Sequence, residues 1–327
     1  MHPALEAIAG KRIIVVGDVV LDHFVRGEVD RISPEAPVPV VRVTRENDMP
    51  GAAANVALNL AALDARPIMV GIVGDDADGR RLRELLVRHN VDCTYLITDK
   101  QTRTTRKTRV IARAQHLVRV DWDTVLDRAA VQRCGMLNAV TQAIPACDGV
   151  VVQDYNKGLI TDELMEMVSR VNVPVVVDPN RYHPIRYRGT VSTPNLEEAR
   201  ILSGVAHGSS QAIDHLDEIA GGFFARHDVR HLVITLGEHG IALCAPDGVI
   251  RRRPAACTHD VYDVSGAGDT VAAMLASALA AGVDLWTACQ LANAAGGIVV
   301  GKMGTATTSR DEIQNLLDQA GPGALAP

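Results

Sequence analysis

The stretch Arg12-Ile-Ile-Val-Val-Gly17, which ends at Asp18, is short, rich in β-branched residues and apolar along its whole length. Such a run is typical of a parallel strand that is covered by helices on both faces. Runs of the same kind recur at residues 68–73, 149–152, 173–177 and 231–235. The sequence therefore predicts a central sheet in which most strands are parallel.

Segments with helical periodicity separate these strands. They cover residues 53–63, 79–89, 161–171, 195–202 and 212–227. Strands that alternate with helices indicate a layered α/β fold, in which the crossover connections are right-handed.

Two stretches break this alternation. Residues 22–44 alternate polar and apolar side chains and contain three prolines, and residues 93–123 read as further short strands with a turn near 112–115. We expect antiparallel strands that form one small β-sheet, a lid over the ends of the core strands. The α/β core would then comprise residues 1–21, 45–92 and 124–320, the lid residues 22–44 and 93–123, and a flexible tail residues 321–327. An exposed apolar face of this lid predicts a homodimer formed through the lid.

The composition narrows the class of protein. The 327 residues carry 33 Lys and Arg against 39 Asp and Glu, a net charge of −6, which argues against nucleic acid as a partner. The six cysteines are scattered without a C-x-x-C pair, which is typical of reduced thiols in the cytoplasm. No apolar core follows a basic start at the N-terminus, and the apolar stretch 271–283 is too short for a membrane span. We expect a cytoplasmic protein with no membrane partner.

The sharpest local motif is Asp263-Val-Ser-Gly-Ala-Gly-Asp-Thr270, which an apolar helical stretch follows at once. Gly266, Ala267 and Gly268 would present backbone N–H groups at a helix start, where the helix dipole favours an anion. Asp269 would lie beside a transferred phosphoryl group and accept the proton of a substrate hydroxyl. The motif thus predicts phosphoryl transfer with Asp269 as the general base. The residues alone fit an ordinary capped helix start equally well.

Two glycine patterns, one of them within this motif, resemble nucleotide-binding motifs but do not match them. Gly266-Ala-Gly268 opens like a dinucleotide fingerprint, but Val271 stands where that fingerprint has its third glycine. Residues 296–302 have the spacing of a P-loop, but Met303 replaces the Ser or Thr that would bind magnesium. The missing third glycine disfavours a dinucleotide-dependent oxidoreductase.

Five motifs in a fixed order resemble the ribokinase-like (PfkB-type) carbohydrate kinases. They are the first-strand element Gly17-Asp18 with Asp22, the Gly-rich stretch 51–57, Asn195-Leu-Glu-Glu198, Thr235-Leu-Gly-Glu-His-Gly240, and the motif 263–270. The resemblance extends from Ile13 to about Ile313 and implies a three-layer ribokinase-like α/β fold with a small β-sheet lid. It departs from the family at Ala52, where many members have a second glycine.

The resemblance also implies the roles of the site residues. Asp269 would be the base, with the amides of Gly266, Ala267 and Gly268 around the phosphoryl group. The sugar would contact Asp18, Asp22, Gly51 and Asn55. ATP would lie along Asn195, Thr235, Gly237, Gly240 and Asn293. Glu198 would position Mg²⁺ through water, although the spacing of Asn195 and Glu198 also fits a helix-capping pair. Ser265, with Asp263, would order the adjoining loop or a monovalent cation such as K⁺.

A dense basic stretch, residues 103–109, lies in the expected lid. Strand alternation places Lys107 and Arg109 on one face, and Arg119 and Lys157 are further cations nearby in the predicted topology. So many cations predict a substrate that carries its own phosphate, with these four residues as its ligands. A solvated strand face explains any one of them as well.

Three stretches narrow the resemblance within the family. Residues 31–41, 154–158 and 261–270 resemble the branch that uses ATP to phosphorylate the anomeric hydroxyl of D-glycero-β-D-manno-heptose 7-phosphate, on the route to ADP-heptose for lipopolysaccharide. The expected partners are therefore ATP and a small sugar phosphate. Another sugar or sugar-phosphate kinase of the family, such as a fructokinase, and a non-catalytic sugar-phosphate sensor remain open alternatives.

Overall fold

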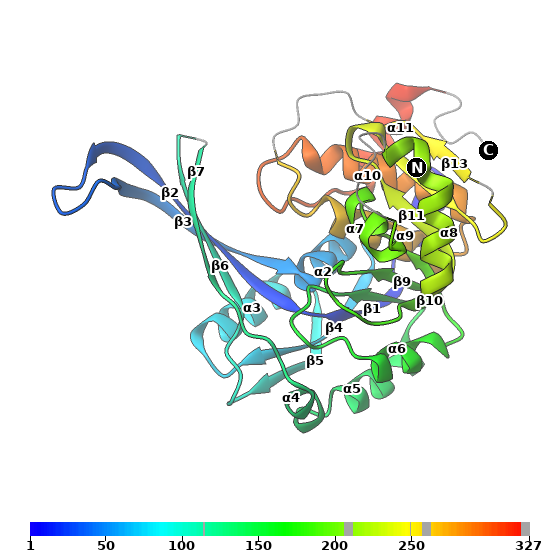
Figure 1. Ribbon diagram of the computed structural model, residues 1–327, viewed down its shortest axis with the longest axis horizontal. Helices are drawn as coiled ribbons and strands as arrows, with labels where there is room; N and C mark the ends of the chain where they lie inside the picture. Colours follow the sequence, from blue (N-terminus) through cyan, green and yellow to red (C-terminus); the bar gives the residue numbers. More distant parts are fainter. Residues whose placement is uncertain (114, 206–211, 249, 257–262, 322–327) are drawn as a thin grey trace.

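The computed structural model describes residues 1–113, 115–205, 212–248, 250–256 and 263–321. Residues 261–262 of the motif region and the expected flexible tail beyond residue 321 lie outside these ranges. The strands form a nine-stranded sheet in the order β13-β12-β11-β10-β9-β8-β1-β4-β5 and a four-stranded sheet in the order β3-β2-β6-β7 (Figure 1).

The nine-stranded sheet is parallel except at one edge, where β12 and β13 pair antiparallel. Its strands are β1 (Arg12–Gly17), β4 (Arg66–Gly74), β5 (Asp92–Asp99), β8 (Gly149–Gln153), β9 (Val175–Asp178), β10 (Arg188–Ser192), β11 (Asp228–Thr235), β12 (Ile241–Cys244) and β13 (Ile250–Arg253). The apolar runs noted in the sequence therefore lie where a parallel sheet was expected.

Helices cover both faces of this sheet. Alternate residues of β1 show it: Ile13 and Val15 pack into one hydrophobic cluster, whereas Ile14 and Val16 pack into the other. The first cluster holds α1 (Pro3–Ile8), α2 (Ala53–Ala62), α3 (Ala77–Arg88), α9 (Ala267–Ala280), α10 (Leu285–Val300) and α11 (Arg310–Ala320). The second holds α4 (Arg128–Arg133), α5 (Met136–Ala143), α6 (Asp162–Ser169), α7 (Leu196–Ser203) and α8 (Leu216–Arg226). This arrangement confirms the three-layer α/β fold.

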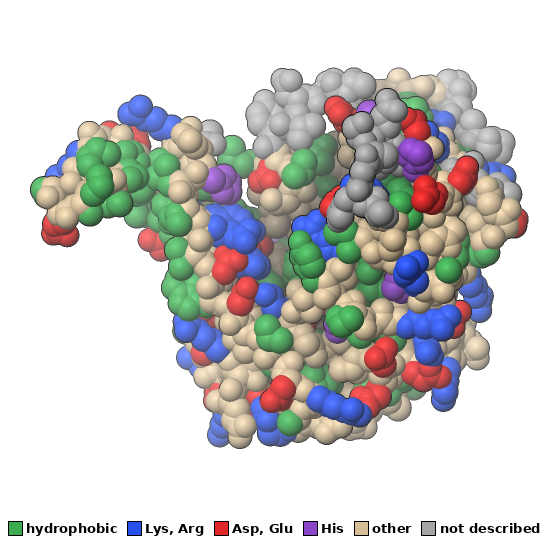
Figure 2. All heavy atoms as spheres, in the orientation of Figure 1, with side chains coloured by type: hydrophobic (Ala, Val, Ile, Leu, Met, Phe, Trp, Pro, Cys, Tyr) green, Lys and Arg blue, Asp and Glu red, His purple; other side chains and the backbone are tan. Residues whose placement is uncertain are grey.

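The four-stranded sheet, here called the lid sheet, projects away from the three-layer body (Figure 1). It consists of β2 (Val19–Ile32), β3 (Pro39–Ala52), β6 (Arg106–Ala112) and β7 (Gln115–Trp122). Strands β2 and β3 are long hairpin partners, and each enters the body at its inner end, where Val19 pairs with Ala52. Figure 2 shows a hollow between the root of this sheet and the body.

Two expectations about the lid were wrong. Residues 93–99 belong to β5, which pairs parallel with β4 at the edge of the large sheet, because their half-buried pattern suits an edge strand covered on one side. The lid sheet is also not wholly antiparallel, since β2 and β6 run parallel. These two strands are far apart in sequence, so no hairpin turn fixes their direction.

None of the helices within the described ranges combines the length and the apolar composition that a bilayer crossing requires.

Candidate active site

Asp269 lies in the first turn of α9. The turn before it depends on Gly266, which has φ +82° and caps the helix in the left-handed region that favours glycine. A Cβ on Gly266 would lie 2.7 Å from the Asn55 amide nitrogen, so a side chain here would also push away a residue that contacts Asp269. The glycine is therefore required by backbone conformation and by space.

The Asp269 carboxylate is buried and accepts three side-chain hydrogen bonds. Asn55 donates to Oδ2 at 2.7 Å, while Gln153 and Tyr155 donate to Oδ1 at 3.0 and 3.3 Å. Burial raises the pKa of Asp269 to about 7, although the bonds from Asn55 and Tyr155 oppose the rise. A carboxyl group with a pKa near neutrality is suited to general base catalysis.

A chain of buried polar groups fixes Asn55 against α9. Asn59 donates to the Asn55 carbonyl at 2.9 Å, and the Thr270 hydroxyl donates to Asn59 Oδ1 at 2.8 Å. These polar groups lie between α2 and α9, in a layer that is otherwise aliphatic. Satisfied buried polar groups of this kind specify one packing of two helices.

The start of α9 also supplies backbone donors. The Ala267 amide already donates to the Val264 carbonyl at 3.3 Å. Within the described ranges, the amides of Gly268 and Asp269 donate to no group of the protein, as expected for the first N–H groups of a helix. Gly268 faces open space, so an anion can approach there. Of the three amides predicted for the phosphoryl group, Gly268 is thus freer than Ala267, and Asp269 adds another.

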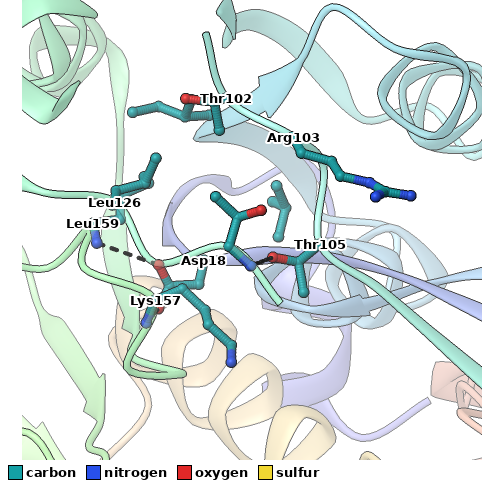
Figure 3. Close-up of a pocket in the computed structure, with 10 residues that line it drawn as sticks. Asp18, Thr102, Arg103, Thr105, Leu126, Lys157 and Leu159 are labelled. Atoms are coloured by element: carbon teal, nitrogen blue, oxygen red, sulfur yellow. Dashed lines mark hydrogen bonds between the residues drawn. The ribbon is translucent and has the colours of Figure 1, made fainter. Parts of the chain in front are cut away.

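Asp18 follows β1, and three backbone amides occupy its carboxylate. Tyr155 and Lys157 donate to Oδ2 at 2.9 and 3.0 Å, and Leu159 donates to Oδ1 at 3.4 Å. Figure 3 shows the Asp18 carboxylate turned toward Leu159, in a small pocket that Thr102, Thr105 and Lys157 also line. Burial, followed by the charge of Asp154, raises the pKa of Asp18 to about 6. Asp18 therefore orders the 155–159 loop, a role that the sequence did not indicate.

Asp22 lies on β2, beside Lys107 of β6. Its carboxylate pairs with Arg109 of β6. A Cβ on Gly51 of β3 would lie 2.3 Å from Asp22 Oδ2, so the glycine leaves the room in which this carboxylate lies. Burial raises the pKa of Asp22, and Arg109 opposes the rise. Asp22, Gly51 and Arg109 thus form one unit at the root of the lid sheet.

The four predicted phosphate ligands are all paired with carboxylates. Lys107 lies 3.0 Å from Asp121, Arg119 lies 2.9 Å from the same carboxylate, and Lys157 lies 2.8 Å from Asp123. Arg109 pairs with Asp22 as described. The strand register places Lys107, Arg109, Arg119 and Asp121 on one face of the lid sheet, together with Asp22.

The predicted nucleotide-side residues gather at the ends of β11 and α7. Asn195 and Glu198 form a capping box: the Glu198 amide donates to Asn195 Oδ1 and the Asn195 amide donates to Glu198 Oε2, both at 2.9 Å. Asn195 also bridges Thr235, the last residue of β11. The structure therefore confirms that Asn195 and Glu198 cap the start of α7. The other carboxylate oxygen, Glu198 Oε1, takes no part in the cap.

Glycines shape the turn that follows Thr235. Gly237 has φ +60° and Gly240 has φ +89°. A Cβ on Gly240 would lie 2.0 Å from the Arg253 carbonyl oxygen, so this glycine permits the close approach of β13.

Asn293 and Ser265 each make a hydrogen bond between a backbone group and a side chain. The Asn293 amide donates to the Pro254 carbonyl at 2.7 Å. The Ser265 amide donates to Asp263 Oδ1 at 2.9 Å, and Gly304 donates to the other oxygen of that carboxylate at 3.1 Å. Asp263 thus ties the turn before α9 to the turn after α10.

Sequence reasoning missed three site residues, Gln153, Tyr155 and Asp178. Gln153 ends β8 and donates through one nitrogen to both Asp269 and Asp178, the residue that ends β9. Burial, then the charges of Glu198 and Asp269, raise the pKa of Asp178 well above its usual range. All three residues stand at or just beyond the carboxyl ends of parallel strands, which is the signal that could have found them.

A divalent cation would stabilise the charged forms of the two acids Asp178 and Glu198. The pKa of Glu198 is also raised, chiefly by burial and against the charge of Arg181, so a cation bound nearby would favour the charged form of both acids. Within the described ranges, no three His, Cys, Asp or Glu side chains are grouped to hold a metal ion directly. These residues therefore fit Mg²⁺ that is held through water, since Mg²⁺ keeps much of its hydration.

Comparison with known proteins places this geometry in a family. The model of the pfkB family carbohydrate kinases matches residues 11–312, and the chain belongs to that family. It is a carbohydrate kinase.

Two relatives narrow the comparison. A D-beta-D-heptose 7-phosphate kinase of Bordetella bronchiseptica is 44% identical over 316 residues, which cover 95% of this chain and 97% of that protein. A bifunctional protein HldE of Hyphomonas neptunium is 39% identical over 97% of this chain and 66% of its own length. The chain thus spans about two thirds of the bifunctional relative.

Solved structures share the fold at low identity. A ribokinase of Arabidopsis thaliana complexed with ribose and ATP has a TM-score of 0.71 at 19% identity, covering 94% of this chain and 99% of that one. Phosphofructokinase-2 from Escherichia coli, in complex with substrates and products, has a TM-score of 0.73 at 18% identity, covering 96% of this chain and all of that one. The predicted ribokinase-like fold is confirmed.

Proposed function

We propose that this carbohydrate kinase transfers the γ-phosphoryl group of ATP to the anomeric hydroxyl of D-glycero-β-D-manno-heptose 7-phosphate. The product is the 1,7-bisphosphate, a precursor of ADP-heptose for the lipopolysaccharide core. The observation that carries the reaction is the buried Asp269 carboxylate, with a pKa of about 7, beside the free amides at the start of α9. The 44% identity to a D-beta-D-heptose 7-phosphate kinase, over nearly all of both chains, supports the choice of sugar.

The contacts of Asp269 indicate which oxygen takes the proton. Oδ1 accepts hydrogen bonds from Gln153 and Tyr155, whereas Oδ2 accepts one from Asn55. A carboxylate oxygen has two lone pairs, so Oδ2 retains one for the sugar hydroxyl. As Asp269 takes the proton, the sugar oxygen attacks the γ-phosphorus, the bond from that phosphorus to the bridging oxygen breaks, and ADP leaves. The Gly268 and Asp269 amides stabilise the charge on the phosphoryl oxygens.

The paired cations of the lid sheet supply the site for the substrate's own phosphate. Lys107, Arg109 and Arg119 of this sheet, and Lys157 of the loop after β8, are paired with Asp22, Asp121 and Asp123. A phosphate dianion competes with these carboxylates for the same donors, and its three oxygens accept several of them at once. An uncharged sugar offers no such competition, so the cluster favours a phosphorylated one.

Mg²⁺ is proposed to lie on the nucleotide side, held through water by Glu198 and Asp178. When bound there, it would neutralise charge on the phosphates of ATP. K⁺ has less support: both oxygens of Asp263 accept backbone amides, so this carboxylate orders its turn. We assign K⁺ no part in the reaction.

The lid sheet is proposed to form a homodimer. The strand register places Val25, Val110, Val118 and Val120 on the face opposite Arg109. Val118 and Val120 are 50% and 40% exposed, and hydrophobic side chains gather over the projecting sheet in Figure 2. A second copy of the same face is the partner that covers it, since a sheet face of this kind is a common contact between identical subunits.

A substrate panel tests the proposed function. ADP formation from ATP is measured with heptose 7-phosphate, fructose, fructose 6-phosphate and ribose, with and without Mg²⁺. We expect kcat/KM for heptose 7-phosphate to exceed the others by about a hundredfold or more. A preference for an unphosphorylated sugar would reject the proposed substrate. Tight sugar-phosphate binding without ADP formation would reject catalysis and indicate a sensor.

A further inference from the structure

Tyr155 contacts both acids of the site with two different parts of one residue. Its backbone N–H donates to Asp18 Oδ2 at 2.9 Å, and its hydroxyl donates to Asp269 Oδ1 at 3.3 Å. Asp18 follows β1, Tyr155 follows β8 and Asp269 begins α9, so these contacts join three separate elements. A shift of the Asp18 carboxylate would therefore move Tyr155 and, with it, the hydrogen bond that Tyr155 donates to Asp269.

Asp18 fixes the loop from which Tyr155 extends. Its carboxylate also accepts the amides of Lys157 and Leu159, at 3.0 and 3.4 Å. The start of the same loop is held at Asp154, which accepts the Tyr187 hydroxyl at 2.7 Å and the Asn156 amide at 2.7 Å. The Tyr155 ring therefore leaves a backbone that is anchored before and after it.

We propose that Tyr155 is a positioning residue for the Asp269 base, and that Asp18 acts on the reaction by holding Tyr155 in place. The proposal rests on the assignment of Asp269 as the base. With Gln153, the Tyr155 hydroxyl occupies Oδ1 and so orients Oδ2 toward the sugar hydroxyl. Without the hydroxyl, one of the three bonds that fix the carboxylate plane is lost.

The charged surroundings of Asp269 stay constant when only this hydroxyl is removed. Asp22 faces Asp269 from β2 and is paired with Arg109, and Asp178 faces it from β9. Tyr155→Phe alters none of these groups and keeps the ring. A change in the pH profile of this variant therefore reports the lost bond to Asp269.

The test compares Tyr155→Phe with wild type and with Tyr182→Phe, a matched change at a tyrosine that is 68% exposed on the turn after β9. We expect the plateau kcat of Tyr155→Phe to fall about tenfold or more, with KM for ATP within about threefold of wild type. Its acidic limb should move to higher pH, because the lost bond favours the charged carboxylate. Tyr182→Phe should match wild type. A kcat–pH profile of Tyr155→Phe that superimposes on wild type would overturn the proposal.

A double-mutant cycle tests the part played by Asp18. Asp18→Asn should lower kcat in wild type and lower it much less in the Tyr155→Phe background, since the same contact is already lost. Additive effects would show that Asp18 acts by another route and overturn that part of the proposal. Thermal unfolding checks that each variant is folded; should Asp18→Asn not fold, the Tyr155→Phe profile still decides the role of Tyr155. The ratios are measured on whichever sugar wild type phosphorylates best, so a wrong substrate is seen in wild type alone.

Discussion

The side-chain amide of Asn55 lies 2.7 Å from Oδ2 of Asp269, although 214 residues separate the two in the chain. This hydrogen bond joins the first turn of α2 to the first turn of α9. It places a residue of the Gly-rich N-terminal motif against the acid of the C-terminal motif. Two stretches that resemble family signatures at opposite ends of the sequence are therefore one site in space.

Replacement of Asn55 by Ala should weaken both the fold and the reaction. The change removes the donor to Asp269 and also Asn55 Oδ1, which accepts from the Asn59 amide at 3.4 Å, although the bond of Asn59 to the Asn55 backbone carbonyl remains. We expect a loss of about 1–3 kcal/mol in the free energy of unfolding, measured by urea denaturation, and a lower kcat. Asn138→Ala, at an exposed position of α5, is the control and should change stability by less than about 0.5 kcal/mol. Equal effects of the two variants would contradict a structural role for Asn55.

Stability should depend on pH through Asp269. Its pKa is about 7 in the folded protein, above its ordinary value of 3.8, so the folded state binds more protons than the unfolded state between about pH 4 and 7. The free energy of unfolding therefore falls as the pH rises through that range, by about 1–4 kcal/mol for this group.

Asp269→Asn removes this dependence, because the amide does not ionise. The difference in Tm between pH 5 and pH 8 should be smaller for the variant than for wild type, in thermal unfolding without ligands. Asp18, whose pKa is about 6, should leave a residual dependence of the same sign in both proteins. The same Tm difference in both would show that Asp269 ionises normally.

Much of this arrangement followed from the sequence. The apolar runs gave the parallel sheet because buried parallel strands are apolar on both faces. The glycines at 266 and 268 pointed to the anion site because they expose consecutive backbone N–H groups where a helix begins. The ion pairs of the predicted phosphate ligands were not foreseen. Lys107, Arg109 and Lys157 meet Asp121, Asp22 and Asp123, respectively, only when segments far apart in the sequence come together in the fold.

Other features depend on contacts that no local pattern encodes. Strand β5 was assigned to the lid since residues 93–99 alternate like a half-exposed strand, and only tertiary pairing with β4 shows where they lie. Gln153 belongs to no motif, and Tyr155 was noted only within the stretch 154–158, which did not indicate a contact with Asp269. Their roles depend on how the end of β8 approaches α9.

Ala52 stores backbone strain next to the site. It has φ +55° and ψ −130°, a region that favours glycine, and it is both the last residue of β3 and the N-cap of α2. Ala52→Gly should therefore be neutral or stabilise the protein by up to about 1 kcal/mol, whereas Ala61→Gly within α2 should destabilise it by about 1 kcal/mol. Urea denaturation of both variants makes the comparison. A clear loss of stability in Ala52→Gly would show that the methyl group contributes packing that outweighs the strain.

The exposed face of the lid sheet should control assembly. Val118→Glu with Val120→Glu places two charges on the apolar face that we propose is covered by a second copy. Light scattering after size exclusion should show a dimer for wild type and a monomer for the double variant. Lys100→Glu, a charge change on the turn after β5, is the control and should remain dimeric. A wild-type monomer at all concentrations would contradict assembly through this face.

The most direct test of the central claim is the rate of ADP formation by Asp269→Asn with heptose 7-phosphate and Mg-ATP, beside Asp284→Asn as the matched control. Asp284 caps α10 by accepting the Thr287 amide, a role that asparagine also performs. We predict that Asp269→Asn lowers kcat by about a thousandfold while ATP binding, measured by calorimetry, is retained, and that Asp284→Asn matches wild type. A kcat of Asp269→Asn within a few fold of wild type would contradict the account, because the proton would then be leaving the sugar without this carboxylate.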